Sequence, residues 1–154
     1  RSHQGVKALD KSNFSRSLNR LTGLISAIFV GVGQSLKDIN TQSMYLIDSF
    51  PVAVCKNIRI SRSKLLKNER FRGKNTSKRE YFYGFKVHLI TTKEGLPVDI
   101  FITPGSVFDA TALQNMAIDL PENSELFADS GYTDYLFEDL FEQQEKIKLM
   151  VARK

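Results

Sequence analysis

Apolar residues in the first quarter of the chain recur at the spacing of a helix. Three of them fall at positions i, i+4 and i+7 and so share one helical face: Phe14, Leu18 and Leu21. Two polar residues just before this face are candidate N-caps: Ser12 and Asn13. Residues 24–39 continue the apolar pattern, but Gly31 and Gly33 would weaken a second helix there. We therefore predict a short helical segment within residues 1–43.

From residue 44 the pattern changes to that of strands. The run MYLIDSF (44–50) is apolar and is followed by Pro51, after which we expect a long, mostly irregular connection. Two further runs are rich in β-branched and aromatic residues: GFKVHLITTKEG (84–95) and LPVDIFITPG (96–105). The short Lys-Glu-Gly-Leu-Pro join between them is typical of a hairpin.

Helices and strands alternate in the last third of the chain. FDATALQNMAIDL (108–120) predicts a helix with Asp109 as N-cap and Pro121 as its end. SELFAD (124–129) predicts a strand, and IKLMVARK (147–154) begins another. The helix predicted between them, over 133–146, has one apolar face made of four residues: Leu136, Phe137, Leu140 and Phe141.

The predicted order is therefore three strands, then helix, strand, helix and strand. An antiparallel meander followed by βαβ units gives a mixed sheet with helices on its faces, which is the ribonuclease H-like α/β architecture. We expect a helical segment over 1–43, a candidate tail of a DNA-binding module. We expect an α/β domain over 44–154 that is incomplete at its C-terminus.

Composition adds few constraints to this outline. The chain has 154 residues, 42% hydrophobic and 25% charged, as in ordinary soluble domains. A single cysteine, Cys55, excludes an internal disulfide and a zinc cluster built on cysteines, and it favours a cytoplasmic location. The most apolar window, 24–33, is about half of the roughly 20 residues that cross a bilayer, so no membrane association is expected. The chain begins at Arg1 without Met or a signal pattern, which predicts a fragment.

Charge is distributed unevenly. Between Lys56 and Lys86 there are eleven Lys or Arg residues and two acids, whereas Glu94 to Glu145 holds twelve acids and no Lys or Arg. Aromatic residues interleave with the basic block, which is typical of a phosphate-binding surface. The basic residues predicted to contact DNA are Arg59, Arg62, Lys64, Arg72, Lys78 and Arg79. The alternative is a solvated loop that serves solubility.

Two of the predicted strands end in the same way, in an aspartate followed by serine. In the ribonuclease H-like arrangement these strands are neighbours, so Asp48 and Asp129 would lie side by side. Adjacent carboxylates repel unless a cation lies between them, and oxygen ligands suit Mg²⁺ or Mn²⁺. A pair of such ions can activate a water or a 3′-hydroxyl for phosphoryl transfer. The alternative is that each aspartate forms a turn or caps a helix.

Three blocks of the sequence resemble the catalytic domain of DDE-type transposases of bacterial insertion sequences. These blocks, in family order, are MYLIDSFPVAV, REYFYGFKVHLITTKEGLPVDIFITPGSVFDATAL and ELFADSGYTDYLFEDL. The resemblance implies that Asp48 and Asp129 bind catalytic divalent ions and that Lys86, in YGFK, faces phosphate. It implies an enzyme that cuts and joins DNA, with transposon ends and target DNA as partners. A homo-oligomer and a nucleoid-associated location in a bacterial cytoplasm are further expectations.

Two departures from the family pattern change the prediction. The family often has His-Asp after Pro-Gly-x-x, whereas this chain has Phe108 before Asp109, and we interpret Asp109 as a helix cap. Family members also carry a glutamate on a helix after the strand that begins at 147. Three glutamates precede that strand and are poor substitutes: Glu138, Glu142 and Glu145. We therefore predict that this chain alone is inactive or nearly so.

Two other functions remain as alternatives. IFVGVGQSLKDIN could be the strand, glycine turn and helix of a dinucleotide-binding unit, but Leu36 stands where the third glycine belongs. The second alternative is a non-catalytic relic or regulator that binds DNA, or pairs with a full-length copy, through its basic face.

Overall fold

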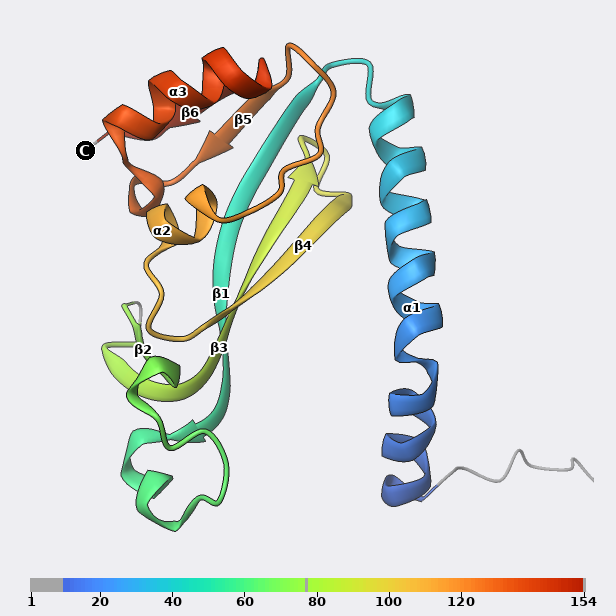
Figure 1. Ribbon diagram of the computed structural model, residues 1–154. Coiled ribbons are helices and arrows are strands. Elements are labelled where there is room, and N and C mark those ends of the chain that lie inside the picture. Colours follow the sequence, from blue (N-terminus) through green and yellow to red (C-terminus); the bar gives the residue numbers. More distant parts are fainter. Residues whose placement is uncertain (1–9, 77, 154) are drawn as a thin grey trace, which may run out of the picture.

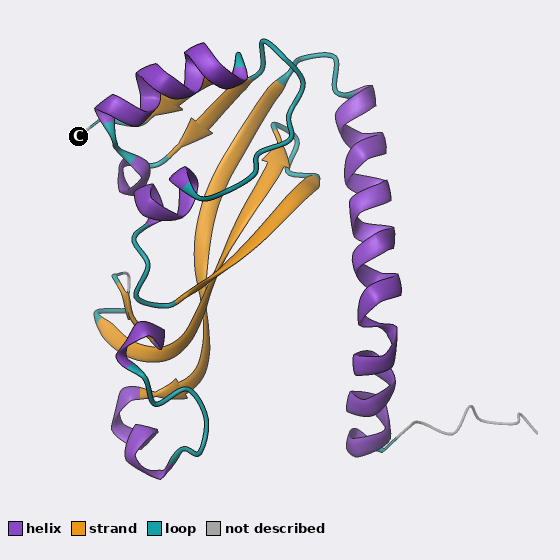
Figure 2. Cartoon of the chain, viewed as in Figure 1, coloured by secondary structure: helices purple, strands orange, loops and turns teal. Residues whose placement is uncertain are grey.

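The computed structural model describes residues 10–76 and 78–153, and its centre is a six-stranded mixed sheet (Figures 1 and 2). The strands lie in the order β2-β3-β1-β5-β6, and β4 also pairs with β3. Their bounds are β1 Met44–Lys56, β2 Arg72–Asn75, β3 Glu80–Thr92, β4 Pro97–Pro104, β5 Glu125–Ala128 and β6 Lys148–Val151. The α-helices are α1 Lys11–Ile39, α2 Asp109–Gln114 and α3 Tyr135–Glu145.

Strand β1 organises the sheet because its two neighbours run in opposite directions. It pairs antiparallel with β3 along almost its whole length and parallel with β5 over residues 44–47. Strand β6 then pairs parallel with β5. The ribonuclease H-like α/β fold predicted from the element order is therefore confirmed.

The core lies on the face of the sheet that α2 and α3 cover. Side chains alternate along β1, so Tyr45 and Ile47 are buried while Leu46 and Asp48 are exposed. The buried core residues come from the sheet, from α2 and α3 and from the segments beside them, namely Tyr45, Ile47, Ile90, Val98, Leu113, Leu120, Leu126, Ala128, Tyr132, Phe141, Ile147 and Leu149.

Helix α1 differs from the prediction in its length and its cap. It is one continuous helix from Lys11 to Ile39, and its N-cap is Asp10, not Ser12 or Asn13, because the Asp10 carboxylate accepts hydrogen bonds from both of their backbone N–H groups. The helix continues through Gly33 because this glycine packs directly against the backbone of Val98 on β4. No helix in the described part of the chain is long and apolar enough to span a membrane.

The two later helices, in contrast, are shorter than predicted. Helix α2 ends at Gln114, seven residues before Pro121, because the chain from 116 to 120 leaves the helix and buries Leu120 in the core. Its N-cap is Phe108, so the interpretation of Asp109 as a cap is wrong. In α3 only Phe137 and Phe141 face the core, whereas Leu136 and Leu140 are exposed, because one side of the helix alone meets the sheet.

The basic connection after Pro51 is more ordered than predicted. Strand β1 continues through Pro51 to Lys56, and two 3-10 helices follow it, η1 Asn57–Arg62 and η2 Glu69–Phe71, before β2. We call residues 57–71 the distal lobe, because they lie at the far end of the long β1–β3 ribbon (Figure 1, bottom). The lobe lies within the stretch from Lys56 to Lys86 that is rich in Lys and Arg.

Candidate active site

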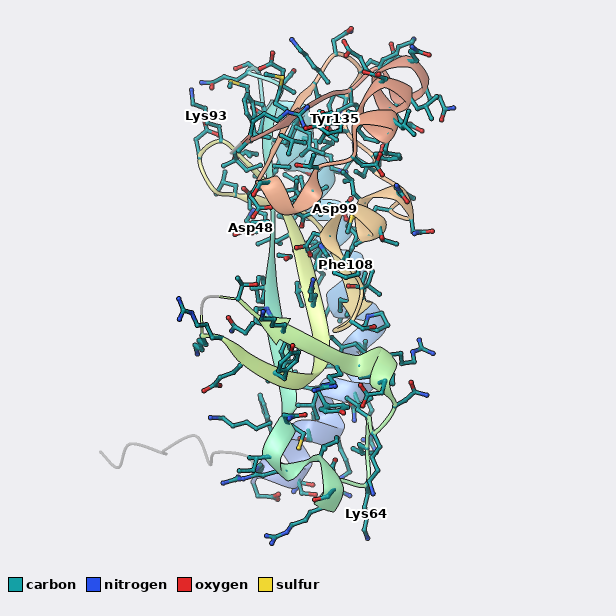
Figure 3. All side chains as sticks on the ribbon, turned by 90° about the vertical axis from the view of Figure 1, so that its left-hand side faces the viewer. Asp48, Lys64, Lys93, Asp99, Phe108 and Tyr135 are labelled. Atoms are coloured by element: carbon teal, nitrogen blue, oxygen red, sulfur yellow. The ribbon has the colours of Figure 1, made fainter. Side chains whose placement is uncertain are left out.

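The register of the sheet brings Asp48 and Asp129 to adjacent positions. Ile47 of β1 pairs with Ala128 of β5, and the next residues along the two strands are the two aspartates. Both line one hollow of about 280 Å³, beyond the last residue of β5. In Figure 3 Asp48 lies below α3, which carries Tyr135, and far above the part of the lobe that holds Lys64. Two carboxylates 81 positions apart in sequence thus border the same space.

Each aspartate uses one oxygen in a local hydrogen bond. Asp48 Oδ1 accepts from the backbone N–H of Ser49 at 2.7 Å, and Asp129 Oδ1 accepts from that of Gly131 at 3.0 Å. Asp129 is also the N-cap of the short 3-10 helix η3 Ser130–Tyr132. It therefore caps a helix, as the alternative interpretation predicts, and lines the hollow as well. Among the described residues, the second oxygen of each carboxylate accepts no hydrogen bond from protein, which leaves it open to a ligand.

A third carboxylate, Asp109, borders the same hollow. Its Oδ1 lies 3.1 Å from Lys86 Nζ and accepts a hydrogen bond from Ser49 Oγ at 3.0 Å. A methyl group on Gly131 would lie 3.0 Å from an Asp129 oxygen and 3.2 Å from an Asp109 oxygen, so these two acids are close neighbours. Asp109 stands in the family block PGSVFDATAL, which was the available signal, but its interpretation as a helix cap did not predict a place beside Asp129.

Lys86 does not face open solvent as a free phosphate ligand would. Its side chain is only 16% exposed, and its ammonium group donates both to Asp109 and to the backbone oxygen of Val107, at 2.8 Å. The YGFK lysine therefore lines the hollow with its charge neutralised by Asp109. That it faces phosphate, as the resemblance implies, stays a prediction.

Behind these groups lies a fully buried histidine. His88 Nδ1 is 2.9 Å from the Tyr132 hydroxyl, and Nε2 is 2.9 Å from Thr103 Oγ1. Burial lowers the pKa of His88, with a smaller opposing effect from Asp109. Burial also raises the pKa of Tyr132, and the nearby Asp109 adds to this. The Tyr132 hydroxyl therefore keeps its proton and can donate a hydrogen bond to His88. These contacts fix the wall of the hollow next to Asp109.

Comparison with known proteins identifies the family. Residues 38–154 match the family model described as "Transposase DDE domain". This chain belongs to the transposase DDE domain family. A comparison with curated proteins gives no match. Among solved structures, the chain is similar to a piggyBac transposase in a cryo-EM synaptic complex with hairpin DNA, at 14% identity and a TM-score of 0.44. The similarity covers 71% of this chain and 22% of that one, so this chain spans less than a quarter of its length.

The DDE domain presents its predicted DNA-contacting residues at different distances from the two aspartates. Arg59, Arg62 and Lys64 lie in the distal lobe, with Lys64 at its outer end (Figure 3). Arg72 is on β2, where it stacks over Tyr81 at 4.6 Å and pairs with Glu69 at 3.4 Å. Lys78 and Arg79 are exposed in the turn that leads to β3. Only Lys86, of the seven predicted, lines the hollow that Asp48 and Asp129 share.

Lys74 is a basic residue of the DDE domain that sequence reasoning did not select. It is exposed on β2 and lines the hollow together with Asp48, Asp129 and Lys86. Its position two residues after Arg72 puts both side chains on one face of β2, which is the signal that could have found it.

The described DDE domain contains two carboxylates suited to a hard cation, but not a complete metal cluster. Within residues 10–76 and 78–153 no group of three or more His, Cys, Asp or Glu side chains is arranged to hold a metal ion. Asp48 and Asp129 each keep one unbonded oxygen, which fits an ion that takes one or two protein carboxylates and fills its other positions with water. Asp109 differs from them in its charge, because Lys86 already forms an ion pair with its Oδ1. Its Oδ2, like the second oxygens of Asp48 and Asp129, accepts no hydrogen bond from the described residues.

Proposed function

We propose that this chain is part of a DNA transposase that cuts and joins DNA strands by metal-dependent phosphoryl transfer. The observation that carries the proposal is the register of β1 and β5, which brings Asp48 and Asp129 to one hollow. Membership of the DDE domain family supports the same function. The two open carboxylate oxygens would hold Mg²⁺ or Mn²⁺, and the bound ions would activate the attacking oxygen and stabilise the leaving oxygen.

The protein groups around the hollow have their own roles in this proposal. Asp48 and Asp129 bind and orient the cation, and the capping of η3 by Asp129 fixes the direction of its carboxylate. Lys86 and Ser49 hold Asp109 in place, which sets the charge of the wall facing the cation. Lys74 has no ion-pair partner among the described residues and is free to bind a phosphate of the DNA strand.

A second hollow supports a path for DNA away from the aspartates. It shares Lys74, Lys86 and Asp109 with the first and adds the aromatic side chains of Tyr81 and Phe108. Tyr81 is 46% exposed and Phe108 is 77% exposed. Aromatic faces next to basic groups bind nucleotides by stacking and by phosphate contact. We propose that DNA passes over this hollow and reaches the basic distal lobe.

We further propose that a third acid comes from a helix following β6 and that residues 1–154 alone are inactive. The opposite face of the sheet carries an apolar row in register across three strands, formed by Leu46, Phe127 and Met150. Leu46 and Met150 are exposed. Asp48 follows Leu46 by two residues in β1, so it is exposed on the same face of the sheet. An amphipathic helix packed on this row would bring its side chains close to Asp48.

The test is DNA nicking by a longer protein that includes residues after Lys154. We expect nicking that requires Mg²⁺ or Mn²⁺ and that Asp48→Asn and Asp129→Asn each abolish. Asp139→Asn is the matched control, because Asp139 is exposed on α3, away from the hollow. Nicking that survives both aspartate changes would overturn the proposal.

The non-catalytic alternative is favoured by one observation, the lack of a three-acid cluster in the described part of the chain. A regulator would bind DNA through Lys and Arg alone, so its affinity would fall with salt and would not change in Asp48→Ala. A longer protein that binds DNA but never nicks it would support this second function.

A further inference from the structure

Asp48 and Asp129 lie just beyond the backbone pairing that brings β1 and β5 together. The pairing ends at Ile47 and Ala128, one residue before each aspartate, so it does not by itself set the distance between the two carboxylates. Asp129 instead begins η3, in which Tyr132 is the one buried residue. The position of Asp129 therefore depends on what holds Tyr132.

A series of buried polar side chains holds Tyr132 against the sheet. Its hydroxyl is 2.9 Å from Nδ1 of His88, whose Nε2 is 2.9 Å from Thr103 Oγ1 on β4. The rings of Tyr132 and His88 also meet edge to face, with 6.1 Å between their centroids. His88 is fully buried and Tyr132 is 1% exposed, so water does not compete for the hydrogen bond between them.

His88 belongs to the strand that is paired with the other aspartate. Its neighbour along β3, Leu89, pairs with Asp48, and His88 itself pairs with Ser49. The backbone N–H of Ser49 in turn donates to Asp48 Oδ1 at 2.7 Å. The hydrogen bond between His88 and Tyr132 thus connects the two segments that carry the aspartates.

Packing alone does not require a histidine at position 88. A buried polar side chain is costly unless its polar atoms are paired, and replacing both members of a pair by apolar groups of the same shape can be nearly neutral. A fully paired polar network, however, fixes one arrangement of the groups that it connects. Both ring nitrogens of His88 are paired, so the network defines a geometry at this point of the core.

We propose that His88 is a positioning residue for the metal site, because its hydrogen bond to Tyr132 ties η3, which begins at Asp129, to the strand paired with Asp48. The inference rests on the proposed metal-dependent function. His88 itself touches no cation, since its ring is enclosed and both nitrogens are used by protein groups. Loss of its hydrogen bonds should therefore lower the affinity for a cation without removing a ligand.

The experiment measures binding of Mn²⁺ to the 154-residue chain at pH 7.5, from the electron paramagnetic resonance signal of the free ion. Burial lowers the pKa of His88, so the ring is neutral at this pH and His88→Leu changes no charge. We expect His88→Leu and Tyr132→Phe each to weaken binding about tenfold, as is typical of groups that orient metal ligands. Because both changes remove the same hydrogen bond, the double variant should bind about as weakly as either single one.

A conservative variant separates positioning from packing. The carbonyl oxygen of asparagine can accept a hydrogen bond from the Tyr132 hydroxyl in place of Nδ1, so His88→Asn should bind Mn²⁺ more tightly than His88→Leu. Asparagine fills less of the core than leucine, and an effect of packing alone would give the opposite order. That opposite order would overturn the inference.

Two further variants serve as controls. Ile90→Val removes a buried group two residues along the same strand, and it should lower the melting temperature but leave the affinity unchanged. Asp48→Asn removes a proposed ligand and should abolish binding. Binding that Asp48→Asn abolishes but His88→Leu and Tyr132→Phe preserve would overturn this inference and leave the proposed function standing. A wild-type chain that does not bind Mn²⁺ would overturn the metal site and the inference together.

Discussion

Lys86 and Asp109 form an ion pair, with 3.1 Å between Nζ and Oδ1, in the wall of the hollow that holds the two candidate metal-binding aspartates. The two side chains are 16% and 21% exposed, so both charges are largely removed from water. A partly buried charge is costly unless it is paired. This pair therefore links the stability of the domain to the arrangement of its candidate active site.

Removal of Lys86 should destabilise the protein. Lys86→Met leaves the Asp109 carboxylate without its cation, and we expect a loss of about 1–3 kcal/mol in the free energy of unfolding. Urea denaturation measures this loss, and Lys93→Met, on an exposed turn, is the control. Asp109→Asn in the Lys86→Met background should recover part of the loss. If the two changes were simply additive, Lys86 and Asp109 would not be coupled.

His88 should make stability depend on pH. Burial lowers its pKa in the folded state, so the unfolded chain binds a proton first as the pH falls below about 6.5. This contribution to stability is complete above that pH and decreases below it, towards the folded-state pKa. Melting temperatures of the wild type and His88→Gln between pH 5 and pH 8 test this. The wild type should lose more stability than the variant on acidification, and parallel curves would contradict the assignment.

Two glycines of α1 should respond oppositely to alanine. A methyl group at Gly33 would overlap the carbonyl of Val98, whereas one at Gly31 meets nothing within 4 Å. Gly33→Ala should therefore loosen the packing of α1 on β4 and lower the melting temperature. Gly31→Ala should stabilise the helix by roughly 0.5–1 kcal/mol, because alanine has the higher helix propensity. Equal effects of the two changes would show that α1 does not dock at Gly33.

Lys74 should bind one phosphate of the DNA. Each lysine that binds a phosphate adds about one to the slope of log affinity against log salt concentration. Fluorescence anisotropy with duplex DNA should therefore give a slope that is shallower by about one in Lys74→Ala. Lys93→Ala, which changes an exposed lysine outside the hollow, should leave the slope as it was. The same slope in both variants would exclude Lys74 from the interface.

Sequence patterns were sufficient for the sheet and for the meeting of Asp48 and Asp129. Strand order follows from the alternation of elements, and the parallel pairing of β1 with β5 then determines which residues are adjacent. Individual boundaries were less predictable. Pro51 predicted the end of β1, but the strand continues to Lys56. Its pairing with β5 ends at Ile47, so beyond that residue one edge of β1 has no partner strand among the described residues. A proline, which lacks an N–H donor, is tolerated at such an edge.

The role of Asp109 could not be predicted in the same way. Directly before a helix, an aspartate has the sequence signature of an N-cap, and local reasoning therefore assigned it that function. Its actual partners, Lys86 and Ser49, come from β3 and β1, which are distant in sequence. Only the assembled sheet brings these groups together.

The length of the β1–β3 ribbon has a further consequence. Strand β1 continues eight residues from Asp48 to Lys56, roughly 26 Å at the rise of a β-strand, before the distal lobe begins. Base pairs in duplex DNA stack at about 3.4 Å, close to that rise. If DNA binds both at the aspartates and at the lobe, as proposed, the length of the ribbon would space those two contacts about eight base pairs apart.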